Sequence, residues 1–359
     1  ALAQHDLKRL LAYHSVENIG IIALGLGLGM LGVHYGFFAV AALGFAGGLL
    51  HVLNHALFKG LLFLGAGAVA HATGTRDIEQ LGGLLKRMPW TGAAFLAGSV
   101  AICGLPPFNG FASEFLIYVG SFRTLLASGG FALGGLVAVV ALALIGGLAA
   151  ACFTKAFGIV FQGEPRSPAA AAAHEATRSM VAPMLLLAAL CLAIGLGAGV
   201  VVRGLEPVVA QLAGAVAMPD APRWIFPITL GAVLVLLIVL TLVLVWFRRR
   251  LLAGRSVREA VTWDCGYATP AASMQYTATG FAQPLTSGAQ AILRPHVEAK
   301  PPQGIYPASA SFEIHTPDVA RAGIFDPLFR RAGACLGWFR WLQQGQGHWC
   351  VLYIVVVLM

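Results

Sequence analysis

The chain has 359 residues, of which 58% are hydrophobic and only 11% are charged, and its formal net charge is +8. Soluble domains carry roughly 25% charged residues, so this composition excludes an ordinary soluble protein and indicates a membrane protein with several spans. The positive charge does not indicate nucleic-acid binding, because the basic residues lie at the ends of apolar runs and form no solvated basic face.

Apolar stretches long enough to cross a bilayer recur along the chain. We predict transmembrane helices at 15–33, 37–72, 90–128, 131–162, 180–202 and 225–247, and a further span that begins near residue 348. Three of these stretches are longer than the roughly 20 residues that a crossing needs, so they must tilt, kink or break. In 90–128 we expect a break at Pro106-Pro107, because two prolines remove two backbone donors. In 37–72, Gly44, Gly47 and Gly48 permit close helix packing.

The basic residues divide unequally between the two ends of these helices. One end has ten of them and the other has three, so the positive-inside rule predicts that the first end is cytoplasmic. The first set is Lys8, Arg9, Arg76, Lys86, Arg87, Arg166, Arg178, Arg248, Arg249 and Arg250, and the second is Arg123, Arg203 and Arg223.

Composition also predicts how the chain is organised. We expect a helix bundle over 1–163, two additional transmembrane helices and loops over 164–250, and a truncated final span over 348–359. Residues 251–347 contain several prolines and few long apolar runs, which indicates a cytoplasmic, loop-rich extension with short helices. No pair of cysteines has CxxC spacing and no phosphate-binding glycine motif follows a strand, so we expect no metal or nucleotide site.

Ionisable residues inside apolar spans are the most informative feature, because a charge at the bilayer centre is costly and usually marks an ion or proton path. His51, His55 and Lys59 follow each other at four-residue spacing, which places them on one helical face about 6 Å apart per step. Histidine titrates near neutral pH, so such a column is suited to passing protons. The alternative is that the histidines only bond across helices and that the lysine snorkels to the interface. Zinc is disfavoured because the lysine repels a cation.

Other ionisable residues are candidates for the same path. Glu114 follows the Pro-Pro break, and broken membrane helices are tolerated where they line a cavity or the protein interior. Lys155 is either a member of the path or a lysine that snorkels to the cytoplasmic face. His14 and Glu17 are candidates for proton uptake or for interfacial positions. From spacing alone, Lys8 is a topology signal.

Several motifs resemble the antiporter-like membrane subunits of respiratory complex I, multi-subunit cation/proton antiporters and membrane-bound hydrogenases. These motifs are the run from Asp6 to Ser15, the run from His51 to Lys59, the segment from Gly74 to Ile78, Leu81 to Leu84, and Gly104 to Phe115. Within that family, the segments Tyr13 to Gly20, Trp263 to Tyr267, Met274 to Thr277 and Phe281 to Pro284 resemble the hydrogenase-4/formate hydrogenlyase branch.

The resemblance implies an all-α, polytopic fold with a discontinuous helix, corresponding to the C-terminal half of an inverted-repeat structure. The N-terminal half would then precede Lys8. It also implies that Lys8 is a conduit lysine, that His51, His55 and Lys59 form the central relay, and that Glu114 is the terminal group. Some relatives have lysine in place of Glu114.

The expected function is redox-driven proton translocation, with sodium as an alternative ion, in a prokaryotic inner membrane. Partners would be other membrane subunits and a peripheral redox arm. Iron–sulfur and nickel–iron or flavin centres are expected only in those partners, so this chain would contain no cofactor of its own. The alternatives are membership of a multi-subunit Na+/H+ antiporter and a purely structural role without pumping.

Overall fold

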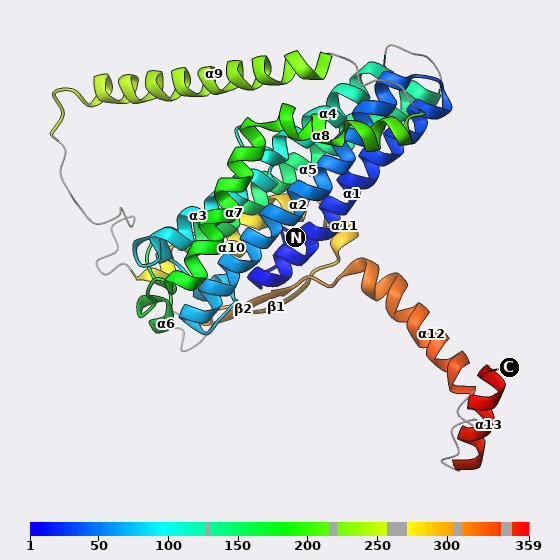
Figure 1. Cartoon of the computed structure of the whole chain (residues 1–359). Helices are drawn as coiled ribbons and strands as arrows, with labels where there is room; N and C mark the ends of the chain where they lie inside the picture. The colour runs from blue at the N-terminus through cyan, green and yellow to red at the C-terminus, as the bar shows by residue number, and fades with distance from the viewer. Residues whose placement is uncertain (126–129, 215–220, 257–270, 305–309, 339–346, 359) are drawn as a thin grey trace. The chain divides into compact units, whose positions relative to one another are not determined.

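The computed structural model describes residues 1–125, 130–214, 221–256, 271–304, 310–338 and 347–358 (Figure 1). The chain forms two compact units, Ala1–Ala282 and Gln283–Met359. The main helices of the first unit are α1 (Leu7–His34), α2 (Phe38–Thr73), α3 (Pro89–Ile102), α4 (Asn109–Thr124), α5 (Gly130–Phe161), α7 (Arg178–Leu196), α8 (Ala198–Leu212) and α9 (Ala221–Leu252). Short turns are η1 (Ile78–Gln80), η2 (Leu84–Lys86), α6 (Pro168–Ala171) and η3 (Ala272–Met274).

Four of the described helices, α1, α2, α5 and α7, are long and apolar enough to cross a membrane, and α3 is a shorter apolar helix. The polytopic helical fold predicted from the sequence is confirmed. Local signals set the ends of two of these helices. Asp6 caps α1, since its carboxylate accepts a hydrogen bond from the Arg9 backbone N–H at 2.9 Å. Gly74 ends α2 in the left-handed conformation that glycine adopts without strain.

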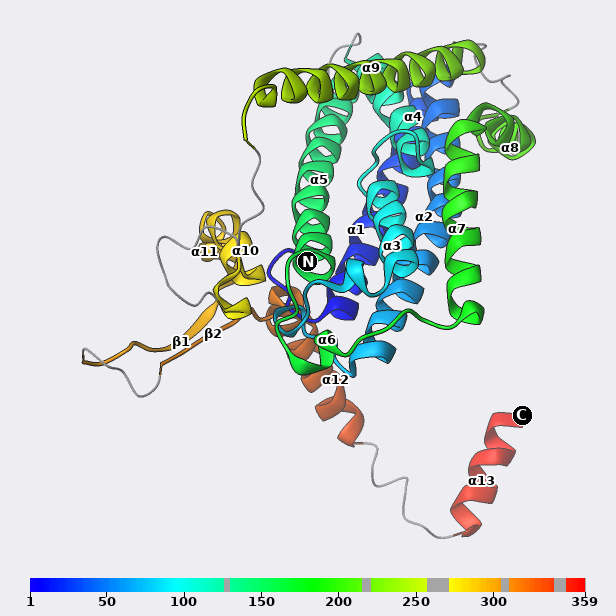
Figure 2. The same cartoon turned by 90° about the vertical axis from the view of Figure 1, so that its left-hand side faces the viewer.

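The break predicted at Pro106-Pro107 is confirmed, because α3 ends at Ile102 and α4 begins at Asn109. Figure 2 shows α3 and α4 following each other along the bundle. The span predicted at 180–202 corresponds to α7, but its predicted end lies too far along the chain, because α7 ends at Leu196 and a separate helix, α8, begins at Ala198. Glycine is a poor helix former, and a side chain at Gly195 would collide with the backbone of Pro107 and Phe108. The end of α7 therefore packs directly against the backbone of the segment between α3 and α4.

Glycines bring α1 and α2 into close contact, as the sequence predicted for Gly44 and Gly48. A Cβ atom added to Gly25 would lie 2.8 Å from the Gly48 Cα atom and 3.1 Å from the Gly44 carbonyl oxygen. No larger residue fits at these positions without separating the helices. This close approach brings the polar side chains of α1 within reach of those on α2.

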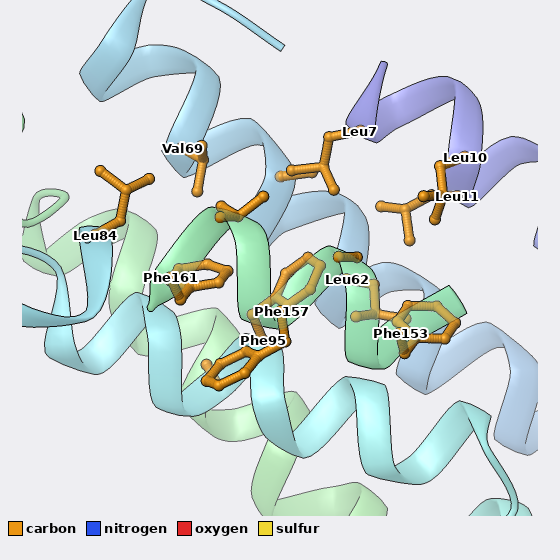
Figure 3. Packing of buried hydrophobic residues seen from close by; sticks show 14 of the residues in the cluster. Leu7, Leu10, Leu11, Leu62, Val69, Leu84, Phe95, Phe153, Phe157 and Phe161 are labelled. Carbon is orange, nitrogen blue, oxygen red and sulfur yellow. The ribbon is translucent and has the colours of Figure 1, made fainter. Parts of the chain in front are cut away.

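Apolar packing closes the end of the bundle where α1 begins. Figure 3 shows Leu7 and Leu11 of α1 near Leu62 of α2, with Phe95 of α3 and the phenylalanines of α5 beside them. Leu7, Leu11 and Leu62 are all at most 1% exposed. Such packing fixes the relative rotation of the helices, and so the direction in which their polar residues point.

The loops at this end carry basic residues that the sequence pattern predicted on one side. Arg76 pairs with Asp6 at 3.1 Å, and Lys86 pairs with Glu164 at 2.7 Å. Arg87 donates to the Ala171 carbonyl oxygen at 2.9 Å. These contacts join loops before α1, after α2 and after α5, which confirms that their basic residues share one end of the bundle. The cytoplasmic location of that end stays a prediction.

The segment that begins at residue 271 docks onto the same loops. The Gln275 side chain forms two hydrogen bonds with the backbone of Glu164. The Glu164 N–H donates to the Gln275 amide oxygen at 2.8 Å, and the Gln275 amide nitrogen donates to the Glu164 carbonyl oxygen at 3.0 Å. Glu79 caps the first turn of α10 (Ala278–Ser287), since its carboxylate accepts from the Thr279 N–H and hydroxyl, both at 2.8 Å, and from the Ala278 N–H at 3.2 Å. The segment from Trp263 to Tyr267, which carries part of the resemblance, lies outside the described residues.

The cap on α10 depends on the charge of Glu79. Burial raises the pKa of Glu79, but hydrogen bonds from the His5 side chain, Thr279 and Ala278 lower it from its ordinary value of 4.5 to about 2. Because the folded state holds this pKa below its ordinary value, the ionised carboxylate stabilises the docked segment fully above pH 4.5. This contribution is lost as the pH falls towards 2.

Replacing Glu79 by alanine is expected to loosen residues 271–282 without unfolding the bundle. Loss of a helix cap costs about 1 kcal/mol, which makes local opening roughly fivefold more frequent. Hydrogen exchange of the peptide containing Thr279 measures this opening. Glu164→Ala is the control, because its exposed carboxylate pairs with Lys86 and does not cap α10. Equal exchange in Glu79→Ala and the unaltered protein would contradict the assigned cap.

Residues 251–347 were predicted as a loop-rich extension with short helices, and the described residues of this range also form an antiparallel hairpin. Strand β1 (His296–Lys300) pairs with β2 (Ser311–His315), with His296 opposite His315 and Lys300 opposite Ser311. The hairpin follows α11 (Gln290–Leu293) and precedes the π-helical turn η4 (Arg321–Phe325), α12 (Asp326–Gly337) and α13 (Gly347–Leu358).

Candidate functional site: a buried polar row

Polar side chains from α1, α2, α4 and α5 are buried inside the apolar first unit. Among the ionisable ones, His51 is 0% exposed, Lys155 1%, Lys59 5% and Glu114 8%. Ionisable groups at such depth are costly unless they have partners. We refer to the following residues as the polar row: His14, Asn18, His51, Asn54, Lys59, Asn109, Ser113 and Glu114.

His51 lies at the meeting point of three helices. Its Nε2 atom is 3.1 Å from Asn18 Oδ1 on α1, and its Nδ1 atom is 2.9 Å from Ser113 Oγ on α4. Asn18 is itself held in place, because its amide nitrogen donates to the His14 carbonyl oxygen at 2.7 Å. Both ring nitrogens of His51 are therefore engaged, and α1 and α4 are joined through one imidazole.

Asn54, one turn after His51, ties α2 to the start of the second half of the broken helix. Its amide nitrogen donates to the Asn109 carbonyl oxygen at 2.7 Å and to Ser113 Oγ at 3.0 Å. The Asn54 Oδ1 atom and both polar side-chain atoms of Asn109 are buried without a hydrogen-bond partner among the described residues. Buried polar atoms of this kind are usually satisfied by ordered water.

Lys59 and the His14–Glu17 pair lie towards the loop end of the row. The Lys59 ammonium donates to the Leu11 carbonyl oxygen on α1, and the His14 imidazole pairs with the Glu17 carboxylate one turn away. His14 is buried, whereas the Glu17 side chain is 20% exposed. Lys8 is half-buried in the first turn of α1, three residues before Leu11. The spacing of His51, His55 and Lys59 predicted a common face, but His55 is only half-buried.

Glu114 lies in the second half of the broken helix, as predicted, but it is the sixth residue of α4 and so lies beyond the first turn. Its carboxylate packs against the turn that contains the break. A Cβ atom added to Gly104 would lie 2.5 Å from Glu114 Oε2 and 2.8 Å from the carboxyl carbon, and Gly104 has a φ of +62°. Only glycine fits this turn, because both the backbone angle and the neighbouring carboxylate exclude a side chain.

For Lys155 the sequence left two interpretations, a member of the path or a lysine that snorkels to the cytoplasmic face. Its ammonium is buried and donates to the Leu2 and Gln4 carbonyl oxygens at 2.5 and 2.8 Å. These backbone groups precede α1, so no local pattern around Lys155 identified them. No role was predicted from the sequence for Asn18, Asn54 or Ser113. Their only sequence signal is a small neutral polar residue inside an apolar helix.

The arrangement provides titratable groups and hydrogen-bond partners, which are the elements of a proton path. Among the described residues, no group of three histidine, cysteine, aspartate or glutamate side chains is positioned to hold a metal ion.

Residues 1–140 match the protein family described as "NADH:quinone oxidoreductase/Mrp antiporter, TM". Hydrogenase-4 component B of Escherichia coli (strain K12) is 41% identical over 307 residues, which are 82% of this chain and 45% of that protein. Formate hydrogenlyase subunit 3 of the same organism is 42% identical over 308 residues, covering 82% of this chain and 47% of that protein. The chain therefore spans about half the length of these relatives. An Na(+)/H(+) antiporter subunit of Bacillus subtilis (strain 168) is 43% identical over 126 residues, which are 34% of this chain and 15% of that protein.

Two solved structures share the fold. A chain of the membrane-bound sulfane sulfur reductase, an archaeal respiratory membrane complex, superposes with a TM-score of 0.66 at 23% identity and covers 99% of this chain and 52% of that one. A chain of the Mrp complex from Dietzia sp. DQ12-45-1b has a TM-score of 0.50 at 23% identity and covers 59% of this chain and 44% of that one. The relatives are subunits of multi-subunit membrane complexes.

Proposed function

We propose that this chain, whose residues 1–140 match the NADH:quinone oxidoreductase/Mrp antiporter transmembrane family, is a proton-translocating membrane subunit of a redox-driven complex of the hydrogenase-4 or formate hydrogenlyase type. Protons move between Lys59, His51 and Glu114 through the polar row. Other membrane subunits and a peripheral redox arm assemble with it in a prokaryotic inner membrane. Iron–sulfur and nickel–iron or flavin centres belong to those partners, and no cofactor is assigned to this chain.

The observation that carries the proposal is the hydrogen-bonded junction at His51. It joins α1, α2 and the broken helix at a depth where an unpartnered charge costs at least about 2.5–3.5 kcal/mol. A structural role alone does not require titratable groups there, because neutral residues also join helices. Moving one charge against 100 mV costs about 2.3 kcal/mol, and interactions that shift a buried group by two pKa units supply about 2.7 kcal/mol.

A second candidate function is cation/proton exchange within a multi-subunit antiporter. It is favoured by the identity to the Bacillus subtilis Na(+)/H(+) antiporter protein over 126 residues. In that case proton movement is driven by a sodium gradient and needs no electron donor.

The intact complex in sealed vesicles distinguishes the candidates. A pH-sensitive dye in the lumen reports proton movement while electron transfer is followed in the same sample. We expect the dye to respond on addition of electron donor in sodium-free buffer and to relax with a protonophore. A response to a sodium gradient without donor would favour the antiporter. Full electron transfer with no dye response to the donor or to a sodium gradient would leave only the structural role.

A further inference from the structure

Ser113 and Asn18 are the immediate partners of His51, and they come from two different helices. The side chains of Ser113, Asn18 and His51 are all 0% exposed, so bulk water does not compete for the hydrogen bonds between them. The directions of these hydrogen bonds follow from the chemistry of each partner, and they limit which protonation states His51 can adopt.

The Nε2 side of His51 faces an acceptor. Because the Asn18 amide nitrogen donates to the His14 carbonyl oxygen, its other atom, Oδ1, is the one directed at Nε2. A carbonyl oxygen accepts only, so the His51 Nε2 atom carries a proton.

The Nδ1 side of His51 faces a group that changes its role. Ser113 Oγ accepts a hydrogen bond from the Asn54 amide, which is oriented by its second bond to the Asn109 carbonyl. Ser113 has one hydroxyl proton and two acceptors within reach, the Gly110 carbonyl oxygen at 3.0 Å and His51 Nδ1 at 2.9 Å. Rotation about the C–O bond moves that proton from one to the other.

We propose that Ser113 and Asn18 are positioning residues that let His51 gain and lose a proton in place. When His51 is neutral, the Ser113 hydroxyl donates to Nδ1 and Nε2–H donates to Asn18. When a proton is added at Nδ1, the imidazolium donates from both nitrogens, and the Ser113 hydroxyl turns to the Gly110 carbonyl. Each state satisfies both ring nitrogens, and no heavy atom moves. This inference rests on the proposed function.

Other titratable groups bear on the same site and are kept unchanged in the test. α3 contributes no histidine, acid, lysine or arginine. The remaining groups on α2 and the helices packed against it are His55, Lys59 and His71 on α2, Lys8, Arg9, Tyr13, His14, Glu17 and His34 on α1, Glu114, Tyr118 and Arg123 on α4, Arg178 and Cys191 on α7, and Arg203 and Glu206 on α8.

The test is the pH profile of protons translocated per electron by the intact complex, measured for Ser113→Ala, Ser113→Thr and Asn18→Ala. Hydrogen bonds to a charged group are about twice as strong as those between neutral groups. Loss of the Ser113 hydroxyl therefore destabilises the protonated state of His51 more than its neutral state. In Ser113→Ala the alkaline limb of the profile is expected to move to lower pH by about one unit. Asn18→Ala moves it in the same direction, and Ser113→Thr keeps the wild-type profile because threonine retains a hydroxyl.

Ser121→Ala is the matched control, because Ser121 is also buried on α4 and its hydroxyl has no hydrogen-bond partner among the described residues. An unshifted pH profile in the assembled Ser113→Ala and Asn18→Ala complexes would overturn the inference. A shift in Ser113→Thr equal to that in Ser113→Ala would also overturn it. If the Ser113→Ala complex does not assemble, the pH profile of the Asn18→Ala complex decides whether the inference stands. Unshifted profiles together with loss of pumping in His51→Leu would overturn only this inference, whereas normal pumping in His51→Leu would overturn the proposed function.

Discussion

Replacing Lys59 by alanine is expected to abolish proton translocation while electron transfer partly survives. Without this ammonium, the path loses the buried titratable group that bonds to α1 near the loop end of the bundle, so a proton crosses that position as an unpartnered charge. That costs at least about 2.5–3.5 kcal/mol, which slows the step on the order of a hundredfold. Electron transfer partly survives because the redox centres are expected in partner subunits.

The measurement is the ratio of protons translocated to electrons transferred in vesicles that contain the intact complex. Lys86→Ala is the control, since Lys86 is an exposed lysine that pairs with Glu164 on a loop. Lys59→Ala also removes a hydrogen bond to the Leu11 carbonyl, so the amount of assembled complex is measured in parallel. A wild-type ratio in assembled Lys59→Ala complex would remove Lys59 from the path.

Replacing Glu114 by glutamine is expected to produce a loss of similar size. Glutamine has nearly the same shape as glutamate, so it fits against Gly104 and leaves the turn at the break intact. It cannot bind and release a proton, so the path lacks its group on the broken helix. We expect translocation to fall on the order of a hundredfold with electron transfer partly retained.

Two variants make this result interpretable. Glu114→Asp keeps a carboxylate and is expected to retain part of the translocation, although the shorter side chain lies farther from its neighbours. Glu164→Gln removes an exposed carboxylate and is expected to have no effect. If glutamine and aspartate at position 114 reduced translocation equally, the role of Glu114 would be in packing and not in proton transfer.

Features set by local chemistry could be predicted from the sequence. The adjacent prolines 106 and 107 predicted the break between α3 and α4, and Gly44 and Gly48 predicted close helix packing on α2, although not that α1 is the partner. The rarity of charges in apolar helices indicated Lys59 and Glu114, both of which are buried.

Features that depend on contacts between distant segments could not be predicted. Lys155 is held by backbone carbonyls more than 150 residues earlier, so its sequence neighbours contained no sign of its partners. Ser113 and Asn18 are ordinary small polar residues until α1, α2 and α4 pack and direct both at one imidazole. The end of α7 near Gly195 depends on the backbone of the broken helix, which the predicted span of 180–202 did not take into account.

The most direct measurement of the central claim replaces His51, whose two ring nitrogens join α1 and the broken helix to the polar row on α2. The ratio of protons to electrons is compared between His51→Leu and His71→Leu, where His71 is an exposed histidine in the last turn of the same helix. We predict that translocation is lost in His51→Leu and normal in His71→Leu, with both complexes assembled. A normal ratio in assembled His51→Leu complex would contradict proton transfer through this row.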